Sequence, residues 1–240
     1  MRSHLRKAGP VTARVTATSI VDAIANDLRT RILEGELTSA AALTETDMAA
    51  SYDVARPTAK AAIEKLVAEG LLVRGAHKSA RVAELGPDSV RDIYQARAYL
   101  ESEVLRRLAL TRTVPEGAVQ ANLDIAAVAG GSALDVVEPD MRFHTSLIDA
   151  VGNERISRMY RSLVSEVRLC MVRVQSLNLL DTALIQAEHQ RLLELIGEGD
   201  GPAAAELLDE HLARARERLA AAIGGEAGPE AHLPSSLHRG

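Results

Sequence analysis

Four residues in the C-terminal half have side-chain types and spacings that suit metal coordination. Asp140 and His144 are four residues apart, so they project from one face of a helix. His189 and His211 are 22 residues apart, and a Gly-Asp-Gly turn at 199–201 lies midway between them. If the flanking helices fold antiparallel about this turn, both imidazoles face each other at the same height. Three imidazoles and a carboxylate suit a divalent transition ion such as zinc, nickel or manganese, with positions left open for water or a ligand.

Each of these residues also has an ordinary structural explanation. A buried histidine is more often a hydrogen-bonded core residue than a ligand, and Asp140 in a first helical turn interacts favourably with the helix dipole. The same side chains can also hold water or an effector directly. Because the one-turn pair coincides with the helical hairpin, we favour metal binding.

Arg97 is a candidate for binding the carboxylate of a small acid. A guanidinium pairs with a carboxylate through two hydrogen bonds and keeps its charge at all physiological pH values. The alternative is an ion pair with Glu101, one helical turn further along the chain. An exposed pair of this kind contributes well under ~1 kcal/mol and needs no particular position. We therefore favour the pocket role.

The elements that must position these residues are helices. Apolar residues recur with helical periodicity, and Gly and Pro stand between the expected helices at 87–111, 115–129, 135–151, 153–177, 181–198 and 202–223. A Pro/Gly linker around 84–88 separates this region from the preceding one. We expect a mostly α protein with four segments: a disordered arm (1–17), a winged helix-turn-helix (18–84), an all-α bundle of six or seven helices (85–223) and a disordered tail (224–240).

Residues 43–82 have the pattern of two short helices at a tight turn followed by a small β-hairpin. The Thr44 hydroxyl can cap a first helix, and Asp53 tolerates the left-handed backbone of the turn. A second helix is expected from about 56 to 69, with Pro57 in its first turn and Gly70 at its end. This is the pattern of a winged helix-turn-helix, which reads duplex DNA.

The second helix is the expected recognition helix, because an α-helix fits the major groove. Its apolar stripe is expected at Ala59, Ile63, Leu66 and Val67, and basic side chains lie outside that stripe. The wing is expected from two strands, 71–73 and 80–82. The candidate DNA-binding residues, with Arg56 ranked first, are Arg56, Thr58, Lys60, Lys65, Arg74, His77 and Lys78.

Composition narrows the class of protein. The chain has 240 residues, is 47% hydrophobic and 2% aromatic, and carries a net charge of −5. Residues 1–85 hold 12 Lys/Arg against 10 Asp/Glu, a net charge of +2, and the remainder holds 16 against 23, a net charge of −7. DNA affinity should therefore come from a local basic surface. The few aromatic residues argue against single-strand or RNA binding by base stacking.

One cysteine, Cys170, excludes an intrachain disulfide and is expected to pack as a small apolar residue in a reducing compartment. The sequence shows no signal-peptide pattern and no long uncharged stretch that could span a bilayer. We expect a soluble, cytoplasmic protein without membrane association.

The N-terminal motifs resemble the winged-helix domain of GntR-type transcription regulators. The resemblance covers about 20–82 and is carried by the opening helix IVDAIANDLRTRILEGEL, Leu43-x-Glu45, Met48-Ala49, Val54 to Lys60 and Glu69-Gly70-Leu71. The sequence departs from the family pattern at Ser39-Ala40, Ala55 and Ser79. Ala55 lacks the hydroxyl that usually contacts a phosphate, so the resemblance implies DNA binding without specifying the operator.

Residues 87–223 resemble the effector-binding domain of the FadR branch of this family, known as FCD. The motifs that carry this resemblance are Arg97-x3-Glu101, Asp140-x2-Phe143-His144, Gly152-Asn153, Glu188-His189 and His211. In metal-binding members, the matching Asp and three His coordinate the ion. The matching Arg faces the cavity and helps to bind a carboxylate.

These observations together predict a ligand-responsive transcriptional regulator that binds a palindromic operator as a homodimer. We expect a repressor in preference to an activator, modulated by a small carboxylic acid at the metal site. Two alternatives stay open. One is a metal-dependent hydrolase that uses the winged helix as an interaction module, although no general base or nucleophile motif is evident. The other is a sensor of the metal ion itself.

Overall fold

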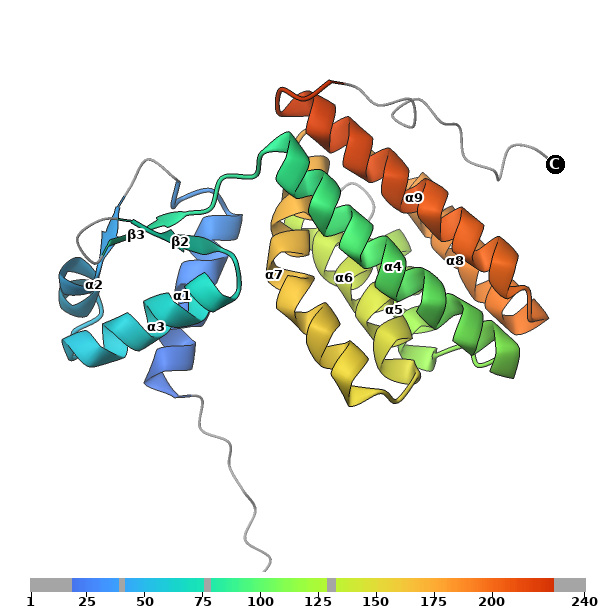
Figure 1. Ribbon diagram of the computed structural model, residues 1–240, viewed down its shortest axis with the longest axis horizontal. Helices are drawn as coiled ribbons and strands as arrows, with labels where there is room; N and C mark the ends of the chain where they lie inside the picture. Colours follow the sequence, from blue (N-terminus) through green and yellow to red (C-terminus); the bar gives the residue numbers. More distant parts are fainter. Residues whose placement is uncertain (1–18, 39–41, 76–78, 129–132, 227–240) are drawn as a thin grey trace, which may run out of the picture.

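The computed structural model describes residues 19–38, 42–75, 79–128 and 133–226. Its N-terminal unit contains α1 (Ile20–Leu33), β1 (Leu43–Thr44), α2 (Glu45–Ser51), α3 (Arg56–Ala68), β2 (Leu72–Arg74) and β3 (Ser79–Val82). The three strands form an antiparallel sheet in the order β1-β3-β2 (Figure 1). The predicted winged helix-turn-helix is confirmed, and the short strand β1, which pairs Leu43 with Ala80, is an addition to it.

Local sequence signals account for the helix-turn-helix geometry. The Thr44 hydroxyl accepts a hydrogen bond from the backbone N–H of Asp47 at 3.1 Å, as expected for the cap of α2. Asp53 adopts a φ of 48° in the turn, and Gly70 adopts a φ of 73° after α3. Glycine accepts this left-handed backbone without strain, whereas Asp accepts it at a small cost.

The predicted apolar stripe of α3 lies in the core of the N-terminal unit. Ala59, Ile63 and Leu66 are fully buried there, whereas Val67 is partly buried and packs against the same cluster. Leu169 also belongs to this cluster, although it is far away in the sequence and lies on a helix of the C-terminal unit. The core of the N-terminal unit is therefore completed by the other unit.

The C-terminal unit is all-helical (Figure 1). It contains α4 (Pro87–Thr111), α5 (Glu116–Ala127), α6 (Ala133–Ala150), α7 (Glu154–Ser176), α8 (Thr182–Glu198) and α9 (Gly201–Ala222). These are the six predicted helices, with ends within two residues of the expected ones. The Asn153 side chain caps α7 by accepting from the N–H groups of Arg155 and Ile156.

The helices of this unit enclose a second, larger core. α4 packs along α9, and α6 packs between α5 and α7. Cys170 lies in this core as a small apolar side chain, and burial raises the pKa of its thiol to about 12. None of the helices in the described ranges has the length and apolar character needed to cross a membrane. The predicted arm (1–17) and most of the predicted tail (224–240) lie outside the described residues.

Candidate metal centre and DNA-binding face

Three helices bring the four predicted ligands together. α6 carries Asp140 and His144 one turn apart, α8 carries His189 and α9 carries His211. One donor atom from each residue lies within 4.8 Å of the others, and all four residues are buried. The ring centroids of His189 and His211 are 5.1 Å apart across the α8–α9 hairpin. The predicted antiparallel packing of α8 and α9 therefore accounts for the proximity of His189 and His211.

Five candidate donor atoms from three of these residues have no hydrogen-bond partner among the described residues. Both carboxylate oxygens of Asp140, Nε2 of His144 and both ring nitrogens of His189 are buried without a hydrogen bond. The nearest approaches are 3.7 Å from His144 Nε2 to Asp140 Oδ2 and 3.6 Å from His189 Nε2 to Asp140 Oδ1. Leaving each such group unsatisfied costs about 1–3 kcal/mol.

A cation would satisfy these atoms together. All four candidate ligands offer a donor atom within 4.8 Å of the others, so a modest contraction of the cluster would bring them to the ligand-bond lengths of roughly 2.0–2.2 Å around one ion. Burial and the nearby charges of His144, His211 and Arg97 hold the pKa of His189 well below its ordinary value. A neutral imidazole has the lone pair that a metal requires. The residues present therefore fit a divalent transition ion.

Two buried carboxylates orient the imidazoles. Glu101 Oε2 lies 2.6 Å from Nδ1 of His144, and Glu188 Oε2 lies 2.9 Å from Nδ1 of His211. When a carboxylate accepts a hydrogen bond from Nδ1–H, the proton stays on Nδ1 and Nε2 is free to coordinate the ion. The motif Glu188-His189 drew attention to Glu188, but its contact with His211 on the neighbouring helix cannot be read from a local pattern.

Arg97, Tyr160 and Arg214 in turn hold these carboxylates. Glu101 Oε1 accepts from Nε of Arg97 at 2.8 Å and from the Tyr160 hydroxyl at 2.9 Å. Burial opposes ionisation of Glu101, but the charge of Arg97 and the contact with His144 hold its pKa well below the usual range. Arg214 lies 2.9 Å from Glu188. The roles of Tyr160 and Arg214 were missed in the sequence, because these contacts depend on tertiary packing.

Arg97 is paired with Glu101 and also borders a cavity. It pairs with Glu101, but the pair is buried rather than exposed, with the two side chains both 2% accessible. Its Nη2 group has no hydrogen-bond partner. Arg97 also borders a cavity of about 20 Å³ together with Tyr94, Asp140 and His211. The pairing and the cavity position are therefore compatible.

The stacking of His189 on Phe143 fixes the third imidazole. The two rings are parallel within 3°, with centroids 3.7 Å apart. Phe143 is fully buried and is the one phenylalanine of the chain. Because His189 has no carboxylate on Nδ1, this apolar contact takes over the positioning role.

Replacing Glu101 with Gln is expected to weaken metal binding about 10–100-fold, because His144 loses the carboxylate that fixes its Nδ1 proton. Competition with a chromogenic chelator measures the affinity. Glu116→Gln, an exposed site on α5, is the matched control and should bind as the wild type does. Equal affinity of Glu101→Gln and the control would show that Glu101 does not position the ligand.

Two family matches cover most of the described chain. Residues 92–214 match the FCD domain, and residues 20–82 match the bacterial regulatory proteins of the gntR family. The chain belongs to the GntR family. It is a GntR/FCD transcriptional regulator, and the resemblances seen in the sequence are confirmed. The family consists of transcriptional regulators, which sets aside the hydrolase alternative.

Curated relatives of this GntR/FCD regulator carry regulatory names. The Nta operon transcriptional regulator of Aminobacter aminovorans is 28% identical over 128 residues, which span 52% of this chain and 61% of that protein. The probable D-xylose utilization operon transcriptional repressor of Paenarthrobacter nicotinovorans is 25% identical over 217 residues, which span 88% and 94%.

Solved structures share the fold. A putative transcriptional regulator GntR from Rhodococcus sp. RHA1 covers 84% of this chain and 98% of its own, with a TM-score of 0.71 at 21% identity. The E. coli protein McbR/YncC covers 83% and 98%, with a TM-score of 0.61 at 16% identity. Both combine with the family matches to support the two-unit architecture.

The DNA-binding candidates of the regulator fall into three groups. Arg56 and Lys60 are exposed on one face of α3 and have no side-chain partner among the described residues. Thr58 lies between them and is half-buried. These three residues occupy the first turns of α3, where a recognition helix contacts base edges.

The other basic candidates are engaged within the protein. Lys65 lies 2.5 Å from Asp22, and Arg74 pairs with Glu64 and, at 3.6 Å, with Glu45. Each would have to exchange a carboxylate for a phosphate to contact DNA. His77 and Lys78, at the predicted wing tip, lie outside the described residues. Arg56 and Lys60 are therefore the leading candidates.

Proposed function

We propose that this GntR/FCD regulator is a homodimeric repressor that binds a palindromic operator and is modulated by a small organic acid at a divalent metal site. Residues 18–84 would read the DNA in the cytoplasm, and residues 85–223 would sense the acid. The observation that supports sensing most strongly is the set of buried donor atoms without partners. One residue of this set, Asp140, borders the same cavity as Arg97, whose Nη2 group also lacks a partner.

The side chains that would hold the ion are Asp140, His144, His189 and His211. The ion, which we expect to be zinc, nickel or manganese, would supply a positive charge to which a carboxylate binds. Arg97 lines the cavity beside Asp140 and His211, so its guanidinium would bind a second anionic oxygen of the same acid. Two anchors of this kind select for an acid over a neutral metabolite.

The cavity itself limits what binds without rearrangement. Its volume of about 20 Å³ suffices for roughly one water molecule. An organic acid therefore requires part of the wall to move, and Met171 and Val174 of α7 form part of that wall. Acid binding would favour a conformation with a displaced wall and shift the equilibrium towards it.

α7 also contacts the winged helix, which gives the wall a mechanical connection to the DNA-reading unit. Leu169 is buried in the N-terminal core, and the Ser165 hydroxyl donates to Glu69 at 3.2 Å. Glu69 caps the end of α3 and also accepts from Arg29 of α1 at 2.8 Å. A shift of α7 would therefore act on α1 and α3 of the reading unit.

Repression and dimerisation have separate support. The relative from Paenarthrobacter nicotinovorans is named a probable repressor, which favours repression here. A monomer carries one recognition helix, whereas a two-fold dimer presents two and so matches a palindrome.

Titration of operator DNA tests the proposed function. The operator is obtained by in vitro selection, and affinity is measured for metal-free protein, for protein with one metal, and for metal-loaded protein with a panel of small acids. We expect one acid to change operator affinity at least fivefold, and to do so with metal present but not without it. Absence of operator binding in every state would contradict the proposed function.

The small cavity supports a second candidate function, a sensor of the metal ion itself. One water-sized occupant fits the cavity as it stands, whereas an acid does not. In the same titration, metal alone would then change operator affinity, and no acid would add to that change.

A further inference from the structure

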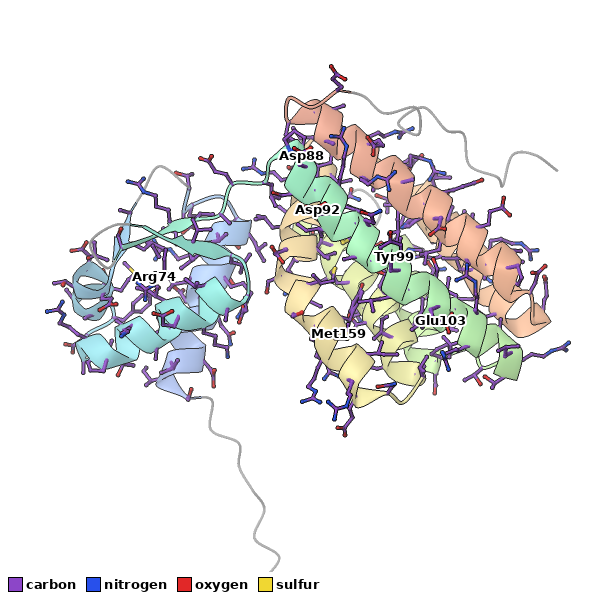
Figure 2. All side chains as sticks on the ribbon, in the orientation of Figure 1. Arg74, Asp88, Asp92, Tyr99, Glu103 and Met159 are labelled. Atoms are coloured by element: carbon purple, nitrogen blue, oxygen red, sulfur yellow. The ribbon has the colours of Figure 1, made fainter. Side chains whose placement is uncertain are left out.

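The outward side of α4 carries a row of exposed side chains, which we name the α4 row. Its members are Asp88, Asp92, Gln95, Tyr99, Glu103, Arg106 and Leu110. They follow at intervals of three or four residues, so they form one stripe along the helix. Figure 2 shows the labelled members in line on the open side of α4. None of them is covered by another described part of the chain.

The α4 row has large apolar side chains where a soluble monomer would favour charged ones. Tyr99 is 72% exposed and Leu110 is 84% exposed. Met159 of α7, which is 57% exposed, lies on the same side of the molecule as Tyr99 (Figure 2). Tyr and Met are enriched at protein interfaces, whereas Asp and Glu, which make up three of the seven members of the α4 row, are depleted there. The exposed apolar side chains, and not the overall composition of the row, therefore indicate a contact surface.

Two charged members of the α4 row, Asp92 and Arg106, are complementary to each other when the row is reversed. Asp92 and Arg106 each lie seven residues from Tyr99, on opposite sides of it. Both are exposed, and neither has a partner in the described ranges. A second copy packed antiparallel, with its Tyr99 against this one, places each Asp92 opposite an Arg106. The same register places each Gln95 opposite a Glu103 and each Asp88 opposite a Leu110, so the charge complementarity is confined to the Asp92–Arg106 pairs.

We propose that the α4 row forms the two-fold interface of the homodimer, with Tyr99 at the symmetry axis. This inference rests on the homodimer of the proposed function and specifies where it forms. A two-fold contact requires a surface that complements itself, and the Asp92–Arg106 register meets that requirement twice. A different protein as partner would not require this symmetry, so a second copy is the occupant.

The length of α4 fits the same arrangement. Its ends, Pro87 and Thr111, are equidistant from Tyr99, so the two helices would pair over their full length. At about 1.5 Å per residue, the two Pro87 residues would be about 36 Å apart. The linker to the winged helix immediately precedes Pro87 in each copy.

Charge exchange in the full-length protein tests the inference. Asp92→Arg and Arg106→Asp each convert two attractive pairs into repulsive ones, so each should raise the dimer dissociation constant about tenfold in sedimentation equilibrium. The double variant restores opposite charges and should return within about threefold of the wild type. Glu206→Arg, an exposed site on α9, is the matched charge change and should have no effect.

Cross-linking provides a second measurement. Tyr99→Cys places one thiol of each copy at the axis, and mild oxidation should give a covalent dimer. Cys170 is buried and should not react. A Cys at Glu206 is the control and should stay uncross-linked.

Two results would overturn the inference in distinguishable ways. A dimer whose dissociation constant is unchanged by both single charge reversals, or is not restored by the double variant, excludes this face while leaving the regulator intact. A wild-type protein that is monomeric and binds no operator would remove the homodimer and the proposed function together.

Discussion

The double variant His189→Ala/His211→Ala is expected to lose the bound metal entirely. It removes two of four donors and leaves Asp140 and His144, which alone bind a divalent ion far more weakly. Elemental analysis of the purified protein should fall from about one ion per chain to less than about 0.1. Metal should also stop raising the melting temperature, because an ion that binds only the folded state stabilises that state.

A histidine outside the cluster is the matched control for this variant. His232→Ala makes the same chemical change in the C-terminal segment outside the described residues and should retain the metal. Circular dichroism of the double variant distinguishes loss of the site from loss of the fold, since truncating two buried rings leaves cavities. Equal metal content in a folded double variant would refute the four-residue ligand set.

Arg56→Ala is expected to abolish specific operator binding, with a loss of affinity of about 10–150-fold. Arg56 is exposed at the start of α3 and has no internal partner. A bidentate contact from Arg to guanine contributes about 1–3 kcal/mol of discrimination against the wrong base. Fluorescence anisotropy with the selected operator and with a scrambled duplex measures both affinity and discrimination.

Arg191→Ala, on α8, is the control because it removes the same charge from a helix of the C-terminal unit and its side chain is 37% exposed. It should leave operator binding within about twofold of the wild type. If Arg56→Ala weakens the operator and the scrambled duplex equally, Arg56 contacts a phosphate and does not read a base. An operator affinity equal to that of the wild type would exclude Arg56 from DNA recognition.

Features set by local patterns were predictable from the sequence. Gly and Pro interrupt the helical periodicity, so the six helices of the C-terminal unit were located to within two residues. The His189–His211 pairing was predictable because a hairpin places residues equidistant from its turn opposite each other. The position of Asp140 and His144 on one face of their helix was predictable from the helical repeat alone.

Features that depend on packing between distant segments were not predictable. Glu101 and His144 meet although 43 residues separate them, and Lys65 meets Asp22 from another helix. The strand β1 is two residues long, too short to show an alternating pattern. The small volume of the cavity depends on how side chains of several helices fill space, which no spacing rule gives. Two roles for Arg97 stayed open because the local sequence does not show that its ion pair with Glu101 is buried.

The position of Leu169 bears on how such regulators are assembled from parts. A fragment ending at the linker, residue 84, would lack a side chain that is 7% exposed in the core of the N-terminal unit. The linker at residue 84 therefore does not mark the edge of a unit that folds cooperatively by itself. Exchange of this winged helix onto another sensor domain would succeed only if the new domain supplied an apolar side chain at the place of Leu169. The N-terminal unit therefore depends on a side chain of its own C-terminal domain for a complete core.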